Sequence, residues 1–380
     1  MKFLLEMLGM TNQCNLNCTY CDWKKEPYHS MTEEEYLIAR KNIEKTREIM
    51  DESFPEYCLM QYSGGEPFLY PRIIEDVLDV YHDKWIRLNT NGLSFPDSII
   101  SKIKEHGKTY VAVSIDGFTM KSMAPRIGTQ ENLLKKILDN LDMLISKEIP
   151  VMILCTLSIA NITDFPSFVD YLESKYSDAI AKGMLAMPAH CVTSYSVKHD
   201  EVEDSEIIDK FENYIKNEAQ NHILLKYILP HYEHMIYYLR HNDRMVLCTI
   251  SDWTISMHFR GNSIIDDSHF LSFGCGMRGV RDLGAFDIND SKDISLFVNK
   301  LQYVEENKKE EFRFKEYDVG GEKECNTKCF PDWIMFDLIL TGQASSDNAQ
   351  KWFVLFKDKK VKDFIKYFSE KYLEIEYKAV

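Results

Sequence analysis

Three cysteines lie close together near the amino terminus, in the stretch CNLNCTYC that runs from Cys14 to Cys21. Three residues separate Cys14 from Cys18, and two separate Cys18 from Cys21. Three thiolates on one short segment can bind three irons of a [4Fe–4S] cubane and leave the fourth iron open to an outside ligand. A structural zinc site normally has four protein ligands, and this stretch contains no fourth Cys or His. The spacing therefore favours an iron–sulfur site, with a zinc site or incidental thiols as the alternatives.

The same stretch resembles the cysteine motif of the radical S-adenosylmethionine (SAM) superfamily, in which an aromatic residue, here Tyr20, directly precedes the last cysteine. In that family the open iron binds the amino and carboxylate groups of SAM. An electron from the cluster cleaves SAM, and the 5′-deoxyadenosyl radical abstracts a hydrogen atom from the substrate. The resemblance implies SAM and a [4Fe–4S] cluster as cofactors, with Cys14, Cys18 and Cys21 as the cluster ligands.

Three further motifs resemble SAM-binding segments of this family. GGEP (64–67) implies backbone and carboxylate contacts with the methionyl ammonium, and glycine lets the backbone approach a ligand closely. NTNG (89–92) and SIDG (114–117) follow, and the resemblance implies that Ser114 and Arg126 contact the ribose and carboxylate of SAM. The implied SAM-binding residues are Tyr20, Gly64, Gly65, Glu66, Pro67, Asn89, Ser114, Asp116 and Arg126.

Strand-like and helical stretches alternate through the first 190 residues, as the positioning of these motifs requires. One helix is expected after Ser30 and Thr32, each of which has a glutamate three residues later, as in a capping box; others are expected near Pro71 and over 128–147. The alternation predicts an α/β fold, a partial (β/α)6 TIM-like barrel with its chemistry at the carboxyl ends of the strands. The expected strands lie within 3–10, 57–63, 85–90, 109–115, 150–157 and 183–189.

Four more cysteines, Cys248, Cys275, Cys325 and Cys329, follow the predicted barrel. Four thiolates can fully ligate a second [4Fe–4S] cluster. The set resembles twitch, a shortened form of the SPASM extension of the same superfamily, and implies one auxiliary cluster. A hairpin with its turn at 261–262 fits between the first two of these cysteines. The alternatives are that some of the four are unbound thiols or that the set binds zinc.

The expected organisation has a large domain followed by a smaller one, as a chain of 380 residues suggests. The predicted segments are a radical SAM core barrel at 1–200, a helical connector at 201–247, a small α+β twitch/SPASM-like auxiliary-cluster domain at 248–342, and a C-terminal helix packing on the body at 343–380.

The net charge and the apolar runs of the sequence limit which binding partners and which cellular compartment are expected. The formal net charge is −15 and the isoelectric point is about 5.3, so nucleic acid is not expected as a partner. No apolar run approaches the roughly 18 residues that cross a bilayer, and no signal peptide is recognisable, so no membrane partner is expected. A cytoplasmic location follows, where the ten cysteines are expected as ligands or thiols rather than disulfides.

Three cysteines belong to neither set. Cys58 and Cys155 lie within predicted strands and are expected in the core. Cys191 follows the sixth predicted strand, where a thiol could donate hydrogen to a substrate radical; a packing role is the alternative. No residue stands out as the general base.

The sequence thus predicts an oxidoreductase that receives electrons from an external one-electron reductant of flavodoxin or ferredoxin type. The expected reaction is oxidation or crosslinking of a peptide or protein, as in maturases of ribosomally made peptides. One alternative is a dehydrogenase or epimerase acting on a carbohydrate, an aminoglycoside or a peptide. A non-catalytic metal-binding scaffold is the other.

Overall fold

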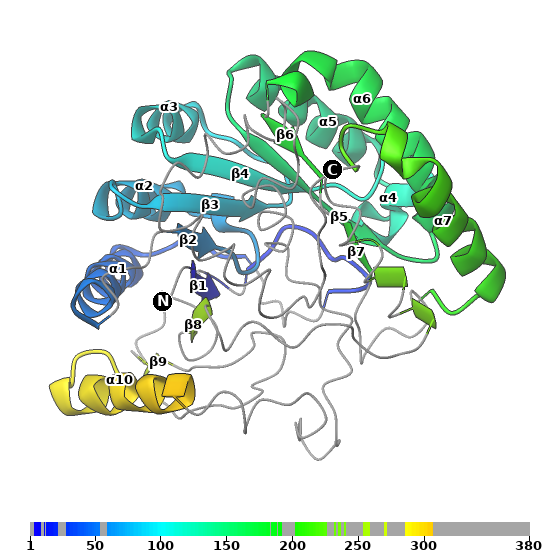
Figure 1. Ribbon diagram of the computed structural model, residues 1–380. Helices are drawn as coiled ribbons and strands as arrows, with labels where there is room; N and C mark the ends of the chain where they lie inside the picture. Colours follow the sequence, from blue (N-terminus) through cyan, green and yellow to red (C-terminus); the bar gives the residue numbers. More distant parts are fainter. Residues whose placement is uncertain are drawn as a thin grey trace.

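A curved parallel sheet forms the centre of the molecule (Figure 1). Its strand order is β6-β5-β4-β3-β2-β1-β8, and β7 also pairs with β5. Every pair in this sheet is parallel, and β1 to β6 follow the order of the chain, which confirms the predicted partial barrel. The computed structural model describes residues 4–8, 11, 13–21, 28–53, 59–182, 184–187, 189–191, 202–225, 232, 235–236, 239–240, 254–258, 270–271 and 286–306.

Each of the six predicted strand segments contains a strand of this sheet. The strands are β1 (Leu4–Leu8), β2 (Leu59–Tyr62), β3 (Trp85–Thr90), β4 (Thr109–Ser114), β5 (Val151–Leu157), β6 (Leu185–Ala186), β7 (Ala189–Cys191) and β8 (Thr254–His258). All seven residues of β5 are buried, and five of the six in β4 are buried. Strands that are buried on both faces need helices or other chain to cover them, and this burial fixes the carboxyl ends of the strands as a rigid platform.

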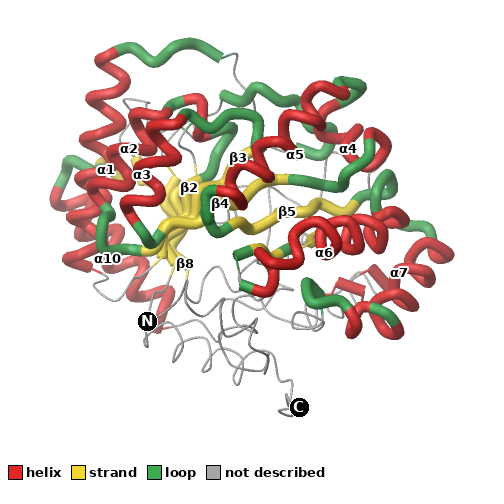
Figure 2. Tube along the Cα trace, turned by 90° about the horizontal axis from the view of Figure 1, so that it is seen from above, coloured by secondary structure: helices red, strands yellow, loops and turns green. Residues whose placement is uncertain are grey.

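Helices line the outer face of the curved sheet, as Figures 1 and 2 show. The first begins at the predicted capping box: the Thr32 hydroxyl accepts from the Glu35 N–H at 3.2 Å, and the Glu35 carboxylate accepts from the Thr32 N–H at 2.7 Å. Pro71 is the first residue of the second helix, as expected. These helices are α1 (Glu33–Ser53), α2 (Pro71–Val80), α3 (Asp97–His106), α4 (Met120–Ile127), α5 (Glu131–Ser146) and α6 (Phe165–Ala181).

The strand β8 comes from the segment that the sequence assigns to the auxiliary-cluster domain. It pairs in parallel with β1, Leu4 opposite Thr254 and Leu8 opposite His258, and so it continues the barrel sheet. The same segment contains the antiparallel pair β9 (Phe270–Leu271) and β10 (Phe286–Asp287), and α10 (Ser291–Glu306). The segment predicted as the helical connector contains α7 (Ser205–Asn217) and the 3-10 helix η4 (Ala219–Asn221). The predicted hairpin turn at 261–262 and the C-terminal helix at 343–380 lie outside the described residues. No helix in the described part of the chain is long and apolar enough to cross a membrane.

Candidate functional site

The loop that carries the three amino-terminal cysteines follows β1 and is tied to the loop that follows β2. The Gly65 N–H donates to the Thr11 carbonyl at 2.7 Å, and the Glu66 N–H donates to the Gln13 carbonyl at 2.8 Å. Cys14 therefore directly follows Gln13, the residue that is hydrogen-bonded to the GGEP segment. Cys14 and Cys18 are half-buried and Cys21 is exposed. The structure brings together the two motifs that the sequence places 50 residues apart.

Two N–H groups point at the sulfur of Cys14. The Leu16 backbone N–H lies 3.4 Å from Sγ, and the Asn91 side-chain amide lies 3.9 Å from it. N–H donors directed at sulfur are typical of thiolates that bind a cluster. Among the described residues, no three His, Cys, Asp or Glu side chains are grouped around a single ion position. A cubane does not require that grouping, because each thiolate binds a different iron.

Glu66 joins the GGEP segment to the end of β3. Its Oε1 accepts from the Phe68 N–H at 3.0 Å and from the Thr90 hydroxyl at 2.8 Å, and its Oε2 accepts from the Asn91 N–H at 2.6 Å. Burial raises the pKa of this carboxyl to about 7, although the three hydrogen bonds oppose the shift. A carboxylate has about four acceptor positions, so one remains for a donor such as the ammonium of SAM.

Two features next to Glu66 suit a ligand that contacts backbone. Gly64 has φ +138°, a conformation that residues with a side chain rarely adopt. The neighbouring Ser63 hydroxyl is buried and has no hydrogen-bond partner within the part of the chain that the structure describes. Buried polar groups normally have a partner. The donors and acceptors present here therefore fit a polar ligand such as SAM.

Asp116 is the centre of a second buried group, at the end of β4. Its carboxylate accepts from Arg126 Nε and Nη2, each at 3.0 Å, from the Thr156 N–H at 2.9 Å, and from the Tyr20 hydroxyl. Burial alone would lower the pKa of Arg126, but Asp116 raises it further above its already high value. Burial raises the pKa of Tyr20, which stays a neutral donor. The side chain of Asn161 donates to the Asp116 carbonyl at 2.9 Å and fixes the backbone there.

The structure places the other predicted SAM-binding residues at the same edge of the sheet. Ser114 is the last residue of β4 and is half-buried. Asn89 lies in β3, where its Oδ1 accepts from Arg87 Nε at 2.9 Å. Pro67 begins the short 3-10 helix η1 (Pro67–Leu69), which the Glu66 side chain caps. Gly117 cannot carry a side chain, because a Cβ there would lie 2.2 Å from Ser122 Oγ.

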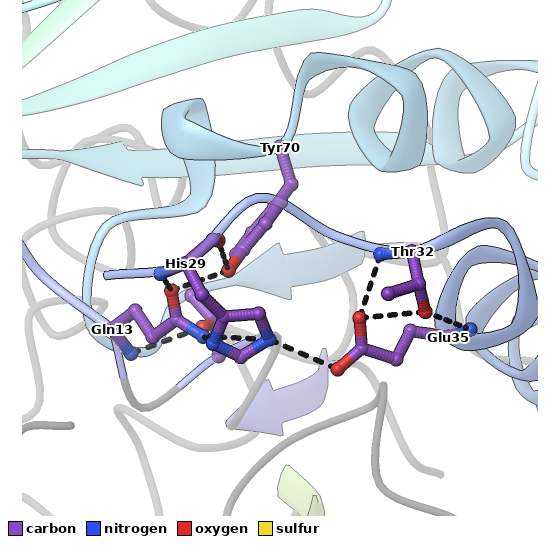
Figure 3. Close-up of polar contacts among 6 residues, drawn as sticks. Gln13, His29, Thr32, Glu35 and Tyr70 are labelled. Carbon is purple, nitrogen blue, oxygen red and sulfur yellow. Dashed lines mark hydrogen bonds and ion pairs between the residues drawn. The ribbon is translucent and has the colours of Figure 1, made fainter. Parts of the chain in front are cut away.

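Sequence reasoning missed a polar network on the outer side of the cysteine loop (Figure 3). Gln13 Oε1 accepts from the Tyr70 hydroxyl at 2.6 Å and from the His29 N–H at 2.8 Å. Gln13 Nε2 lies 2.7 Å from His29 Nδ1, and His29 Nε2 lies 2.9 Å from Glu35. We call Gln13, His29, Glu35 and Tyr70 the outer network. Asn91 was also missed, although it belongs to the recognised NTNG motif.

The remaining predicted residues give fewer structural facts. Cys155 is fully buried in β5, as expected of a core residue. Cys191 is the last residue of β7, where its backbone pairs with Leu157, and its side chain lies outside what is described. Cys58 also lies outside the described residues, as do Cys248, Cys275, Cys325 and Cys329, so the auxiliary cluster stays a prediction.

Comparison with known families agrees with this geometry. Residues 8–172 match the radical SAM superfamily. The matched stretch contains the cysteine loop, GGEP, NTNG, SIDG and Arg126, together with the strands β2 to β5 and the helices between them. The family match therefore covers the cysteine loop and both buried carboxylates, Glu66 and Asp116.

Curated relatives match over part of the chain. The 7-carboxy-7-deazaguanine synthase of Methanocaldococcus jannaschii is 32% identical over 110 residues, which are 24% of this chain and 45% of that protein. The Fe-coproporphyrin III synthase of Methanosarcina barkeri is 26% identical over 172 residues, which are 44% of this chain and 40% of that protein. The chain thus spans less than half the length of these relatives.

Similar solved structures cover more of the chain. Native anSMEcpe with bound AdoMet and Cp18Cys peptide has a TM-score of 0.54 at 14% identity and covers 97% of this chain and 100% of its own. Streptococcus suis SuiB bound to S-adenosylmethionine has a TM-score of 0.55 at 12% identity and covers 94% of this chain and 75% of its own. SuiB bound to precursor peptide SuiA has a TM-score of 0.51 at 11% identity and covers 73% of this chain and 60% of its own. At these identities the similarity shows a shared fold.

Proposed function

We propose, from the premise that residues 8–172 form a radical SAM domain, that this chain cleaves SAM reductively at a [4Fe–4S] cluster held by Cys14, Cys18 and Cys21. We further propose that it oxidises or crosslinks a peptide substrate. The observation that carries the first proposal is the pair of backbone hydrogen bonds, 2.7 and 2.8 Å long, that fix the cysteine loop against the GGEP segment. A thiolate set and a SAM-binding backbone are useful only when they are held together in this way.

The cluster, when bound, supplies the one-electron cleavage of SAM that yields a 5′-deoxyadenosyl radical. The chain's own residues bind and orient SAM. The remaining acceptor position of Glu66 suits the methionyl ammonium. Arg126 uses Nε and Nη2 for Asp116, so Nη1 is the nitrogen offered to the SAM carboxylate. The fully buried β5 supports an environment that excludes water and stray hydrogen donors.

A peptide substrate is supported by the neighbours that cover most of the chain. The anSMEcpe structure holds the Cp18Cys peptide and a SuiB structure holds the precursor peptide SuiA. The curated relatives with other named products match less than half of this chain, which says little about the substrate. Cys248, Cys275, Cys325 and Cys329 are proposed to bind one auxiliary cluster that accepts the second electron. A flavodoxin- or ferredoxin-type protein is the proposed donor of the electron that reduces the SAM-cleaving cluster.

Cleavage of SAM tests the central proposal. Anaerobically reconstituted protein should be brown and should release 5′-deoxyadenosine from SAM after reduction, as chromatography would measure. Cys14→Ala should abolish this release, because one iron loses its thiolate. Cys155→Ala is the matched control and should retain release, because that thiol is buried in the core strand β5. A colourless protein that binds zinc and leaves SAM intact would contradict the proposal.

The substrate class needs a separate experiment. The Cp18Cys peptide, carrying deuterium on its cysteine side chain, is the first probe. Transfer of deuterium into 5′-deoxyadenosine, with loss of two hydrogens from the peptide, is the expected result. Cys325→Ala should still transfer deuterium but stop formation of the oxidised peptide. Transfer from a deuterated aminoglycoside, and none from peptides, would favour the carbohydrate alternative instead.

A further inference from the structure

The Tyr20 hydroxyl links the cysteine loop to the buried ion pair at the end of β4. Tyr20 lies between Cys18 and Cys21 in the chain, and its hydroxyl donates to Asp116 Oδ2. The same oxygen accepts from Arg126 Nε at 3.0 Å, and the Arg126 guanidinium lies 5.6 Å from the centre of the Tyr20 ring. One carboxylate thus contacts both the cysteine loop and the cation beside it.

The Asp116 carboxylate has no acceptor position left for a ligand. A carboxylate offers about four, and the two Arg126 nitrogens, the Thr156 N–H and the Tyr20 hydroxyl fill them. A ribose hydroxyl would have to displace one of these donors before it could bind. Asp116 therefore acts through its neighbours and not by touching SAM.

A second hydrogen bond ties the same part of the loop to the same helix. The Thr19 N–H donates to the Pro125 carbonyl at 2.7 Å. Pro125 lies in the last turn of α4, where carbonyl groups lack partners within the helix. Consecutive loop residues, Thr19 and Tyr20, are thus bound to Pro125 and, through Asp116, to Arg126. The loop and the guanidinium are held as one unit.

We propose that Asp116 is a positioning residue that holds the cysteine loop and Arg126 in one arrangement. Its side chain thereby places both the cluster and the Arg126 guanidinium, which receives the carboxylate of SAM. The inference rests on the proposed cluster and SAM sites. It reassigns Asp116 from a direct SAM contact to a joint support. Its consequence is that a change at Asp116 alters cluster retention even when SAM is absent.

Tyr20→Phe is the sharpest test, because it keeps the ring and removes only the hydroxyl that reaches Asp116. The cluster-loaded variant should release iron to EDTA on the order of tenfold faster than wild type without SAM present, because loss of a supporting contact around a metal site typically weakens metal binding by about that factor or more. It should also change the electron paramagnetic resonance difference spectrum on adding SAM. Tyr176→Phe is the matched control, because it also removes a tyrosine–aspartate hydrogen bond. That bond, 2.7 Å long, joins Tyr176 of α6 to Asp142 of α5 and involves no residue of the cysteine loop. That control should change neither measurement.

Asp116→Asn separates the two roles. If Asp116 is a positioning residue, the variant should release iron faster without SAM and should also bind SAM more weakly. If Asp116 contacts SAM directly, the variant should only bind SAM more weakly. Combining Asp116→Asn with Tyr20→Phe should speed iron release little beyond Asp116→Asn, because both changes break the same link. Iron release at the wild-type rate in both single variants would overturn the inference. Wild-type protein that takes up no iron would overturn the proposed function instead.

Discussion

The carboxylates near the cysteine loop differ in their access to water. Asp116 and Glu66 lie on the inner side, and each is about 1% exposed. Glu35 lies on the outer side, where its side chain is 27% exposed and its partner His29 is 49% exposed. The inner carboxylates have three or four protein donors each, because a buried charge without partners is costly. Glu35 can share its hydrogen bonds with water, so it tolerates an incomplete set.

This difference teaches which contacts fix the site and which only support it. Interactions between buried charges are strong but leave a large penalty when one partner is lost. Interactions between exposed charges are weakened by water and by salt. The inner contacts should therefore dominate the stability of the loop, and the exposed contact between Glu35 and His29 should adjust it slightly.

Loss of the Arg126 cation should produce the largest change. Arg126→Met leaves Asp116 buried without its counterion, and we expect the free energy of unfolding of the metal-free protein to fall by about 3–5 kcal/mol. Urea unfolding would measure this. Arg40→Met is the matched control, because Arg40 pairs with Glu44 on the surface, and such pairs contribute about 0.2–0.5 kcal/mol. Equal losses in the two variants would remove the distinction between buried and exposed ion pairs.

Glu66 should give the inner side a dependence on pH. Its folded pKa is raised to about 7, so the folded protein binds more protons than the unfolded chain between the ordinary value and 7. The stability that this group contributes is present below the ordinary value and is lost as pH rises through about 7. The free energy of unfolding of wild type relative to Glu66→Gln should fall by roughly 3 kcal/mol between pH 4.5 and pH 8.

Urea unfolding at several pH values would check this, with Glu33→Gln as the control. Arg72 holds the pKa of the exposed Glu33 below its ordinary value, so that group titrates below this window. A flat difference between wild type and Glu66→Gln would mean that Glu66 is ionised across the range.

The outer network should give the smallest change. Glutamine can still cap α1 in the place of Glu35, so Glu35→Gln removes mainly the charge next to His29. We expect a loss of about 0.5 kcal/mol at low ionic strength and less at high salt. Thermal unfolding at two salt concentrations would measure it. A loss of the size expected for Arg126→Met would show that the exposed Glu35–His29 contact contributes as much to stability as the buried ion pair.

The sequence was sufficient to predict the barrel and to recognise the motifs that form the inner side of the candidate site. Buried strands such as 151–157 form continuous apolar runs, and the cysteine, GGEP and SIDG motifs are local patterns that can be recognised by spacing. The capping box at Thr32 and Glu35 is likewise local. Such features depend on residues a few positions apart, so one sequence is enough to find them.

Contacts between distant residues could not be predicted in this way. Gln13, His29 and Tyr70 are separated by 16 and 41 residues, and no spacing rule connects them. The NTNG motif contains two asparagines, and the sequence alone favoured Asn89, although Asn91 directs its amide toward Cys14. That choice depends on how the chain turns after the last residue of β3. The pairing of β8 with β1 joins residues about 250 positions apart and leaves no periodic signal.

That pairing has a consequence for synthesis. Until the ribosome has released His258, the first strand has a neighbour on one side only, and its other edge offers unpaired backbone groups to any extended chain nearby. A nascent protein cut short before β8 would expose this edge permanently. We therefore expect truncated chains to self-associate, and the cell to need a chaperone for as long as the edge stays open.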